Sequence, residues 1–320
     1  MTIILWIGFL FLILFLLFLD LGVFNKTDHV IKTKEALLWT IFWIFLSLLF
    51  NVFIYFAYEN HLFGIGKELG HLMSGEEAAL KYFTGYVIEK SLSLDNIFVI
   101  VMIFSYFHIP TIYQHRVLFW GIVGALLMRG AMIFAGVALI EKFEWMIFVF
   151  GGLLIITALK MLFSKEEKVE PNKNILVRFV KKFYRVSDHY DGHKFFTKIN
   201  GATATTPLFI ALVVIESSDV LFAIDSIPAI FAVTTDPFIV FTSNVFAILG
   251  LRALYFALAA MIEKFIYLKI SIVFVLIYVG IKMILSHSYP IPTGFSLAVI
   301  LLILLLGITA SLIKSRVKKH

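Results

Sequence analysis

The stretch Ala211–Phe231, ALVVIESSDVLFAIDSIPAIF, decides what kind of protein this chain forms. It is long and apolar enough to cross a bilayer, yet it carries Glu216, Asp219 and Asp225 and is interrupted by Pro228. Each acid near the membrane centre costs about 2.5–3.5 kcal/mol, so three together cost roughly 8–10 kcal/mol. A helix that faces lipid would not retain that cost. We therefore expect these acids to face protein, water or a bound cation.

The composition of the whole chain is that of a polytopic membrane protein. Of its 320 residues, 61% are hydrophobic and 15% are charged, and the mean hydropathy is +0.98. A soluble domain has about 45–50% apolar and 25% charged residues. The net charge of +6 comes from basic residues in loops and at the C-terminus, which indicates membrane topology and anionic lipid rather than nucleic acid. The chain has no cysteine, so it forms no disulfide and no thiolate metal site.

The apolar runs predict an all-α fold with about nine transmembrane helices of 18–27 residues, each sufficient for a hydrocarbon core of about 30 Å. The first run lacks a basic leader and a cleavage site, so we interpret it as a retained helix. The expected helices are at about Thr2–Phe24, Ala36–Tyr58, Tyr82–Phe107, Val117–Ile140, Met146–Phe163, Pro207–Val233, Phe238–Met261, Tyr267–Leu285 and Gly294–Ile313.

Lys and Arg residues orient these helices. They follow the first helix, contribute nine residues to the loop 164–206 and cluster in the C-terminal tail. All of these segments share one side if the N-terminus is outside, which predicts an external N-terminus and a cytoplasmic C-terminus. In the loop, Ile175–Val186 has the pattern of an amphipathic membrane-surface segment, and Asn200–Gly201 indicates a hairpin with a type I′ turn. A solvated linker is the alternative for both.

An internal repeat is the second strong signal. LIEKF at Leu139–Phe143 recurs as MIEKF at Met261–Phe265, and a Lys-Met pair follows each glutamate by nineteen residues. LLMRG around Arg129 likewise matches LGLRA around Arg252. Helices three to five therefore resemble helices six to eight. Because three is an odd number of crossings, the two copies insert in opposite orientations, as in many transporters with sites near the middle of the membrane.

The repeat divides the chain into five segments. The predicted segments are two N-terminal helices with an external loop (1–79), the first repeat (80–163), a cytoplasmic loop (164–206), the second repeat (207–285) and a ninth helix with a basic cytoplasmic tail (286–320).

The third helix carries a second polar stretch, VIEKSLSLDNIFVI, and two alignments to the sixth helix remain open. Equating Asp95 with Asp219 keeps the distance to the following arginine at 34 and 33 residues. Equating Glu89 with Asp219 and Asp95 with Asp225 needs no gap, but it changes the distance to the arginine by seven residues. We prefer the first because helix length changes less readily than residue type. Under either alignment, carboxylates from two inverted helices converge near the membrane centre.

Four motifs carry a resemblance to a known family. FLDLGVFNK, EKSLSLDN, ESSDVLFAIDSIPAIFAVT and FTSNVFAILGLRALYFAL resemble the TerC family, and the length and the central loop resemble its Alx-type branch. The resemblance covers nearly the whole chain, and every acid of the pattern is present. It implies a bacterial inner-membrane protein associated with manganese export, with tellurite resistance as a historical label, and grouped with inverted-repeat cation and amino-acid exporters.

The residues near the membrane centre also predict an oxygen-donor site for a divalent cation. Five carboxylates face three cations there, an excess of two charges that one divalent ion would neutralise unless the acids are protonated. With no cysteine and no histidine near a helix centre, Mn²⁺, Mg²⁺ or Ca²⁺ fit better than soft metals. Pro228 is expected to free the Ile224 carbonyl beside Asp225. The expected metal ligands are Glu89, Asp95, Asn96, Glu216, Asp219 and Asp225, and the residues expected at ion access or gating are Asp20, Lys90, Arg129 and Arg252.

Each of these residues also has a structural interpretation. Arg129 and Arg252 suit counter-ions rather than ligands, because a guanidinium repels metal and matches a carboxylate; Arg252 is the expected partner of Asp219. Asp20 equally suits a helix cap, and Lys90 equally suits snorkelling to the interface. The remaining acids could instead carry protons or act as gates.

Three classes of function remain open. The leading one is an exporter of a divalent cation, Mn²⁺ by resemblance, with proton coupling as an option. The second is an accessory protein that supplies metal to exported proteins or acts in tellurite response. The third, an intramembrane hydrolase, is weakest because no nucleophile–base set stands out. We therefore expect no enzyme, no tightly bound cofactor and no nucleic-acid partner, with the lipid bilayer as surroundings and the oligomeric state open.

Overall fold

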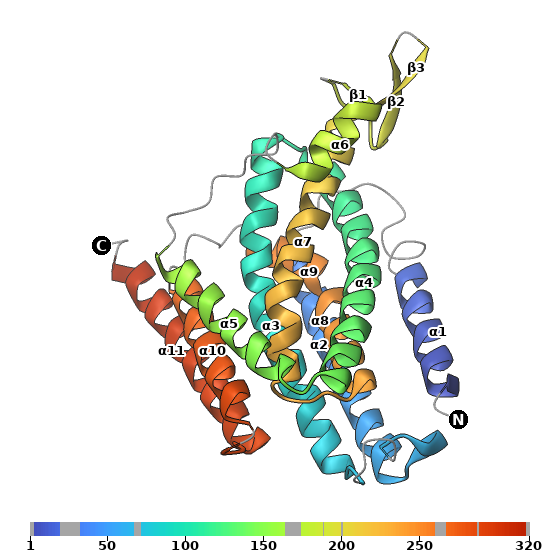
Figure 1. Ribbon diagram of the computed structural model, residues 1–320. Helices are drawn as coiled ribbons and strands as arrows, with labels where there is room; N and C mark the ends of the chain where they lie inside the picture. The colour runs from blue at the N-terminus through green and yellow to red at the C-terminus, as the bar shows by residue number, and fades with distance from the viewer. Residues whose placement is uncertain are drawn as a thin grey trace.

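The computed structural model describes residues 3–19, 33–66, 72–163, 174–187, 189–199, 201–259, 267–286 and 288–317. It is a helical bundle with one small sheet at its end (Figure 1). The helices are α1 (Ile3–Leu19), α2 (Thr33–Glu59), the 3₁₀ turn η2 (Leu62–Gly64), α3 (Gly75–Tyr106), α4 (Thr111–Lys142), α5 (Met146–Phe163), α6 (Ile175–Phe183), α7 (Pro207–Phe231), α8 (Pro237–Leu249), α9 (Leu251–Leu258), α10 (Leu268–Leu285) and α11 (Thr293–Val317). The strands are β1 (Arg185–Val186), β2 (Phe196–Ile199) and β3 (Ala202–Thr205).

The predicted all-α membrane fold is confirmed. In the described part of the chain, seven helices are long and apolar enough to cross a membrane, with α8 and α9 counted together as one. Of the two other expected spans, α1 has only 17 described residues, and α3 carries Glu89, Lys90 and Asp95 in its middle. A total of nine therefore stays a prediction.

Capping residues extend two helices beyond their apolar runs. Ser74 accepts a hydrogen bond from the backbone amide of Glu77, so α3 begins seven residues before the predicted Tyr82. Glutamates in its first turn suit the positive end of the helix dipole. Asp236 caps α8 by accepting from two backbone amides. The hydrophobic pattern locates the membrane-crossing part of a helix, whereas the cap sets its start.

The packing of the two predicted repeats is reciprocal. α3 packs against α8 as α7 packs against α4, and α5 and α10 pack against each other. Following the colours of Figure 1, α3 rises through the bundle and α7 descends beside it. Opposite directions are what two consecutive three-helix units require. The rotation that would relate the units, and the predicted segment boundaries, stay predictions. The second copy of the repeated motif, Met261–Phe265, lies outside the described residues.

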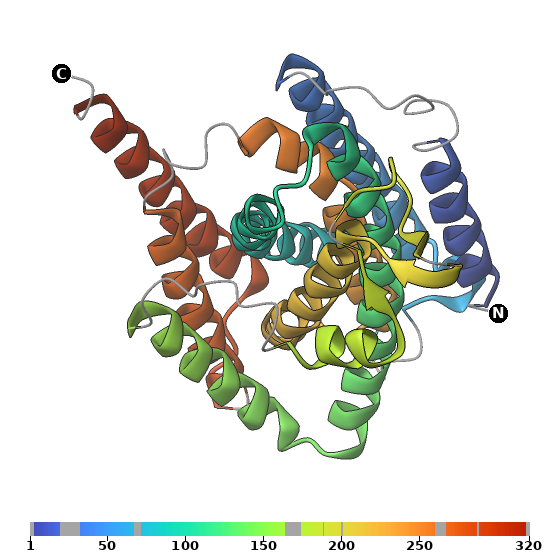
Figure 2. The same ribbon diagram turned by 90° about the horizontal axis from the view of Figure 1, so that it is seen from above.

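Two glycines bring α5 and α10 together. A Cβ atom on Gly151 would lie 3.0 Å from the carbonyl oxygen of Gly280, and one on Gly280 would lie 2.9 Å from that of Gly151. Small residues of this kind let helix backbones touch within a membrane, where packing rather than water exclusion drives association. Seen from above, α5, α10 and α11 form a group to one side of α3, which is viewed nearly end-on (Figure 2).

The interrupted helix is not the one that the sequence predicted. α7 continues through Pro228 to Phe231, and the Pro228 carbonyl still accepts from the amide of Ala232. Proline removes one hydrogen bond, and close to the end of a helix that loss does not stop the last turn. The break instead separates α8 from α9 at Gly250, where a Cβ would lie 2.8 Å from Lys90 Nζ.

The segment after residue 173 forms a small unit at one end of the bundle, opposite the N-terminal end of α1 (Figure 1). The predicted hairpin is confirmed: β2 and β3 pair antiparallel, and Gly201 has a φ of +81°, although Asn200 lies outside the described residues. β1 adds in parallel to β3. The predicted amphipathic segment is helical only as far as Phe183, because Arg185–Val186 joins the sheet.

Candidate functional site

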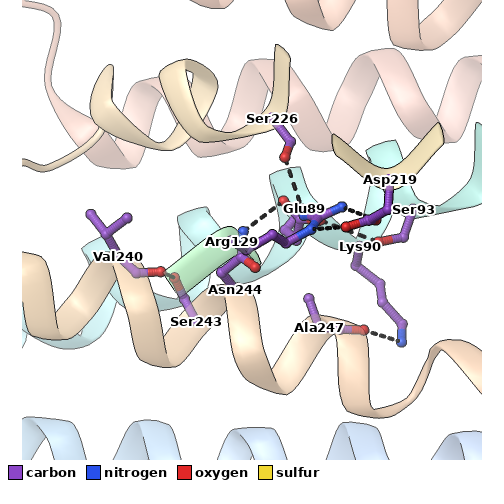
Figure 3. A network of polar contacts seen from close by, with 10 residues as sticks. All are labelled: Glu89, Lys90, Ser93, Arg129, Asp219, Ser226, Val240, Ser243, Asn244 and Ala247. Atoms are coloured by element: carbon purple, nitrogen blue, oxygen red, sulfur yellow. Dashed lines mark hydrogen bonds and ion pairs between the residues drawn. The ribbon is translucent and has the colours of Figure 1, made fainter. Parts of the chain in front are cut away.

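Arg129 of α4 connects α3 and α7 inside the bundle. Its side chain is only 2% exposed. Nε donates to Asp219 Oδ2 at 3.1 Å and Nη2 donates to Asp219 Oδ1 at 2.7 Å, a bidentate pair. Nη1 donates to Glu89 Oε1 and, at 3.2 Å, to Ser226 Oγ (Figure 3). Two carboxylates therefore share one guanidinium, which leaves this unit with one net negative charge.

Asn244 of α8 binds the second oxygen of Glu89. Its Nδ2 donates to Glu89 Oε2 at 3.0 Å, while Ser93 approaches Oε1 at 3.5 Å (Figure 3). Glu89 is fully buried, and Asn244 is 1% exposed. Within the described part of the chain, Asn244 Oδ1 has no hydrogen-bond partner. Sequence reasoning missed Asn244, because a neutral amide costs less to insert into a membrane than a charged side chain and so stands out less in an apolar run.

Lys90 points to the break between α8 and α9. Its Nζ donates to the carbonyl oxygen of Ala247 at 3.1 Å (Figure 3). In an uninterrupted helix that oxygen would accept from the amide of Leu251, so the break between α8 and α9 makes it accessible to Lys90. This contact favours a role of Lys90 inside the bundle over snorkelling to the interface.

Asp95 and Asp225 line one pocket between α3, α5, α7 and α10. Asp225 Oδ1 accepts from Thr157 Oγ1 at 2.8 Å, and Lys160, one turn further along α5, interacts electrostatically with Asp225. Sequence reasoning did not include either α5 residue in the site. Lys160 raises the number of nearby cations to four, so the expected excess of two negative charges falls to one. The polar residues of this pocket are Glu89, Asp95, Asn96, Arg129, Asp225 and Ser226.

A second pocket lies next to the first along α7, closer to the end of the bundle that bears α6. Its polar lining is Asn96, Ser218, Asp219 and Arg252. Asn96 and Phe222 line both pockets. Arg252 thus lies near Asp219, but both oxygens of Asp219 bind Arg129. The bidentate partner of Asp219 is therefore Arg129 rather than the expected Arg252, because packing brings α4 against this face of α7.

The chain matches the model of the integral membrane protein TerC family over residues 74–319. It belongs to the TerC family. It is 50% identical over 312 residues to "Uncharacterized membrane protein STKORF319" of Myxococcus xanthus, covering 98% of this chain and 93% of that protein. It is 44% identical over 301 residues to "Putative membrane-bound redox modulator Alx" of Salmonella typhi, covering 93% and 91%. The Escherichia coli K12 protein of the same name is 43% identical over 307 residues, covering 95% and 93%. No solved structure matches the chain.

In this TerC-family chain, the expected ligands do not form one metal shell. Among the described residues, no three His, Asp or Glu side chains are grouped so that they could hold a metal ion. Glu89 and Asp219 are bound to Arg129, whereas Asp95, Asn96 and Asp225 line the pocket beside them. Glu216 packs on α4, where a Cβ on Gly124 would overlap its carboxylate. Asp20 lies outside the described residues.

Proposed function

We propose that this TerC-family protein is a transporter, not an enzyme, that exports a divalent metal ion from the bacterial cytoplasm. The observation that carries the proposal is the buried Glu89–Arg129–Asp219 unit. Removing three charges from water is expensive, and apolar residues of similar size would hold the helices together at least as well. Ionisable groups retained inside a membrane therefore indicate a pathway for ions or protons.

The donor atoms favour a hard or borderline cation. Carboxylate, amide and hydroxyl oxygens line the pocket beside Arg129, and these ligands suit Mn²⁺, Mg²⁺ and Ca²⁺. The resemblance to the TerC family favours Mn²⁺ among the three. The excess negative charge around this pocket, one after Lys160 is counted, attracts a cation.

The order of the pockets along α7 suggests a route. α7 runs away from the end of the bundle that bears α6, so Asp219 comes before Asp225 on a path from that end. Phe222 lies between them in sequence and lines both pockets with Asn96. With the α6 end facing the cytoplasm, as the basic residues predict, an exported ion would pass Asp219, then Phe222, and then Asp225.

The test is efflux of Mn²⁺ from vesicles that contain the purified protein. We expect wild-type vesicles to release Mn²⁺ faster than protein-free vesicles, and Asp225→Asn to reduce the rate at least tenfold. Glu144→Gln, an exposed acid between α4 and α5, is the matched control and should behave as wild type. If wild-type protein moves none of Mn²⁺, Mg²⁺ and Ca²⁺, the proposal is wrong.

A redox role is the second candidate, because relatives carry the name of a redox modulator. This chain has no cysteine, so it could not act by thiol–disulfide exchange of its own. A redox role of this chain would therefore be an accessory one, exerted through metal delivery or through a partner protein. Binding to a secretion component without metal flux would favour it over export.

A further inference from the structure

We infer, building on the proposed function, that Arg129 is a resident substitute for the transported cation. In the empty protein its guanidinium takes the place of the metal between Glu89 and Asp219. The empty carrier then reorients without binding a counter-cation from the other side. The substrate and Arg129 occupy these two carboxylates in turn.

The first support is that the guanidinium already holds the carboxylates of both Glu89 and Asp219. Both oxygens of Asp219 accept from Arg129. Of the Glu89 oxygens, Oε1 accepts from Arg129 and Oε2 from Asn244. Each of these oxygens keeps a second lone pair, so what opposes a metal ion here is the like charge of the guanidinium that lies between the two carboxylates. A metal ion and the guanidinium therefore compete for the position between Glu89 and Asp219.

The second support is that a displaced guanidinium has somewhere to go. Arg129 lines the same pocket as Asp95 and Asp225, and its Nη1 already contacts Ser226, the neighbour of Asp225. Arginine has a long, flexible stem and stays charged even when buried. A change of side-chain rotamer therefore moves the positive charge from one set of carboxylates to another without taking it into lipid.

The third support is the cost of the empty state. Without a cation, the buried Glu89 and the partly buried Asp219 would leave two uncompensated negative charges at the site. Such a carrier would reorient slowly between the two faces of the membrane. Exchangers meet this requirement by binding a second substrate ion for the return step. Here the guanidinium meets it, so the return needs no external ion.

The geometry also predicts which carboxylate is released first. Asp219 is held by two N–H groups of Arg129, whereas Glu89 receives one and is held on its other oxygen by Asn244. Bidentate pairs are the stronger kind. An incoming cation therefore displaces the guanidinium from Glu89 before it displaces it from Asp219.

The test uses full-length Arg129→Gln protein and Mn²⁺ as the only metal. We expect Arg129→Gln to bind Mn²⁺ at least tenfold more tightly than wild type in calorimetry, because the competing cation is gone. In vesicles with a clamped membrane potential, the variant should retain exchange of Mn²⁺ for Mn²⁺ but lose net efflux into metal-free buffer at least tenfold. Arg129→Lys keeps the charge and should retain net efflux.

Arg116→Gln is the matched control, because Arg116 lies near the start of the same helix with its guanidinium 5.3 Å from the Phe195 ring. It should change neither affinity nor transport mode. Wild-type affinity together with wild-type net efflux in Arg129→Gln would overturn the inference. Loss of both exchange and net efflux in Arg129→Gln protein that keeps its helical content would also overturn the inference.

A measurement on wild-type protein covers the case in which Arg129→Gln does not fold. Net Mn²⁺ efflux by wild type should proceed at the same rate with and without metal ions on the receiving side, at equal pH. A rate that requires a receiving-side cation would overturn the inference while leaving the proposed export intact. Wild-type protein that moves no Mn²⁺ in either mode would instead remove the proposed function, and this inference with it.

Discussion

Arg129 and Asp219 lie 90 residues apart in the chain and form a bidentate ion pair between α4 and α7. The pair joins a helix of the first predicted repeat to a helix of the second. Glu89 of α3 completes the unit from a third helix. The charged centre of this membrane protein is thus assembled from three helices and belongs to none of them alone.

The sharing of one guanidinium predicts an order of stabilities. Asp219→Asn leaves Arg129 paired with Glu89, whereas Arg129→Gln leaves two buried carboxylates without a cation and should cost about 3–5 kcal/mol. Thermal unfolding in detergent should therefore rank wild type above Asp219→Asn, and Asp219→Asn above Arg129→Gln. Added Mn²⁺ should raise the melting temperature of Arg129→Gln more than that of wild type, because a bound ion replaces the missing charge.

Variants of the Arg129–Asp219 pair distinguish a structural role of Asp219 from a role in transport. The double variant Asp219→Asn/Arg129→Gln leaves one carboxylate, Glu89, without a cation instead of two, so it should regain part of the stability lost in Arg129→Gln. If Asp219 only holds helices together, Mn²⁺ efflux should return with stability. We expect efflux to remain absent in vesicles, because the carboxylate is needed for the ion itself.

Asn244 should matter for the site although it carries no charge. Asn244→Leu removes the donor to Glu89 Oε2 inside the bundle, and a buried acceptor left without its donor costs about 1–3 kcal/mol. We expect a lower melting temperature and weaker Mn²⁺ binding by calorimetry. Thr242→Val is the control, because the Thr242 hydroxyl on the same helix donates to backbone carbonyls of its own turn. Equal effects of both variants would contradict a specific role for Asn244.

The α5–α10 contact predicts opposite effects for neighbouring glycines. Gly151→Ala places a Cβ 2.8 Å from Ile284 and 3.0 Å from the Gly280 carbonyl, so it should destabilise the protein by about 1–3 kcal/mol. Gly152→Ala meets nothing within 4 Å and should stabilise by up to about 1 kcal/mol through helix propensity. Thermal unfolding of the two variants measures the difference. If Gly152→Ala destabilises the protein and Gly151→Ala does not, the described packing of α5 on α10 is wrong.

Topology can be tested against a background free of cysteine. Lys198→Cys lies on the exposed hairpin and Asn60→Cys in the turn after α2, at the opposite end of the bundle. With the N-terminus outside, an impermeant thiol reagent added to intact cells should label Asn60→Cys and spare Lys198→Cys. The reverse pattern would invert the orientation and the inferred direction of transport.

The membrane character of this protein is determined by its sequence alone. Insertion depends on the summed transfer free energy of each apolar segment, which is a local property, so hydropathy sufficed to predict an all-α membrane fold. The same reasoning identified Glu89, Asp219 and Arg129 as exceptional, because a charge in a 20-residue apolar run is costly wherever its partner is. The hairpin at Gly201 followed from its turn residues.

The partners of those charges were decided only by the tertiary structure. Arg252 was the expected arginine partner of Asp219, but the packing of α4 on α7 supplies Arg129 as its bidentate partner. Thr157 and Asn244 enter the site for the same reason, as does the bend at Gly250 against Lys90. Inside a membrane, helix association follows from close packing and polar contacts between particular faces, since lipid is as apolar as the side chains it replaces. Hydropathy therefore determines that a helix inserts, whereas the shape of its surface determines which charges it meets.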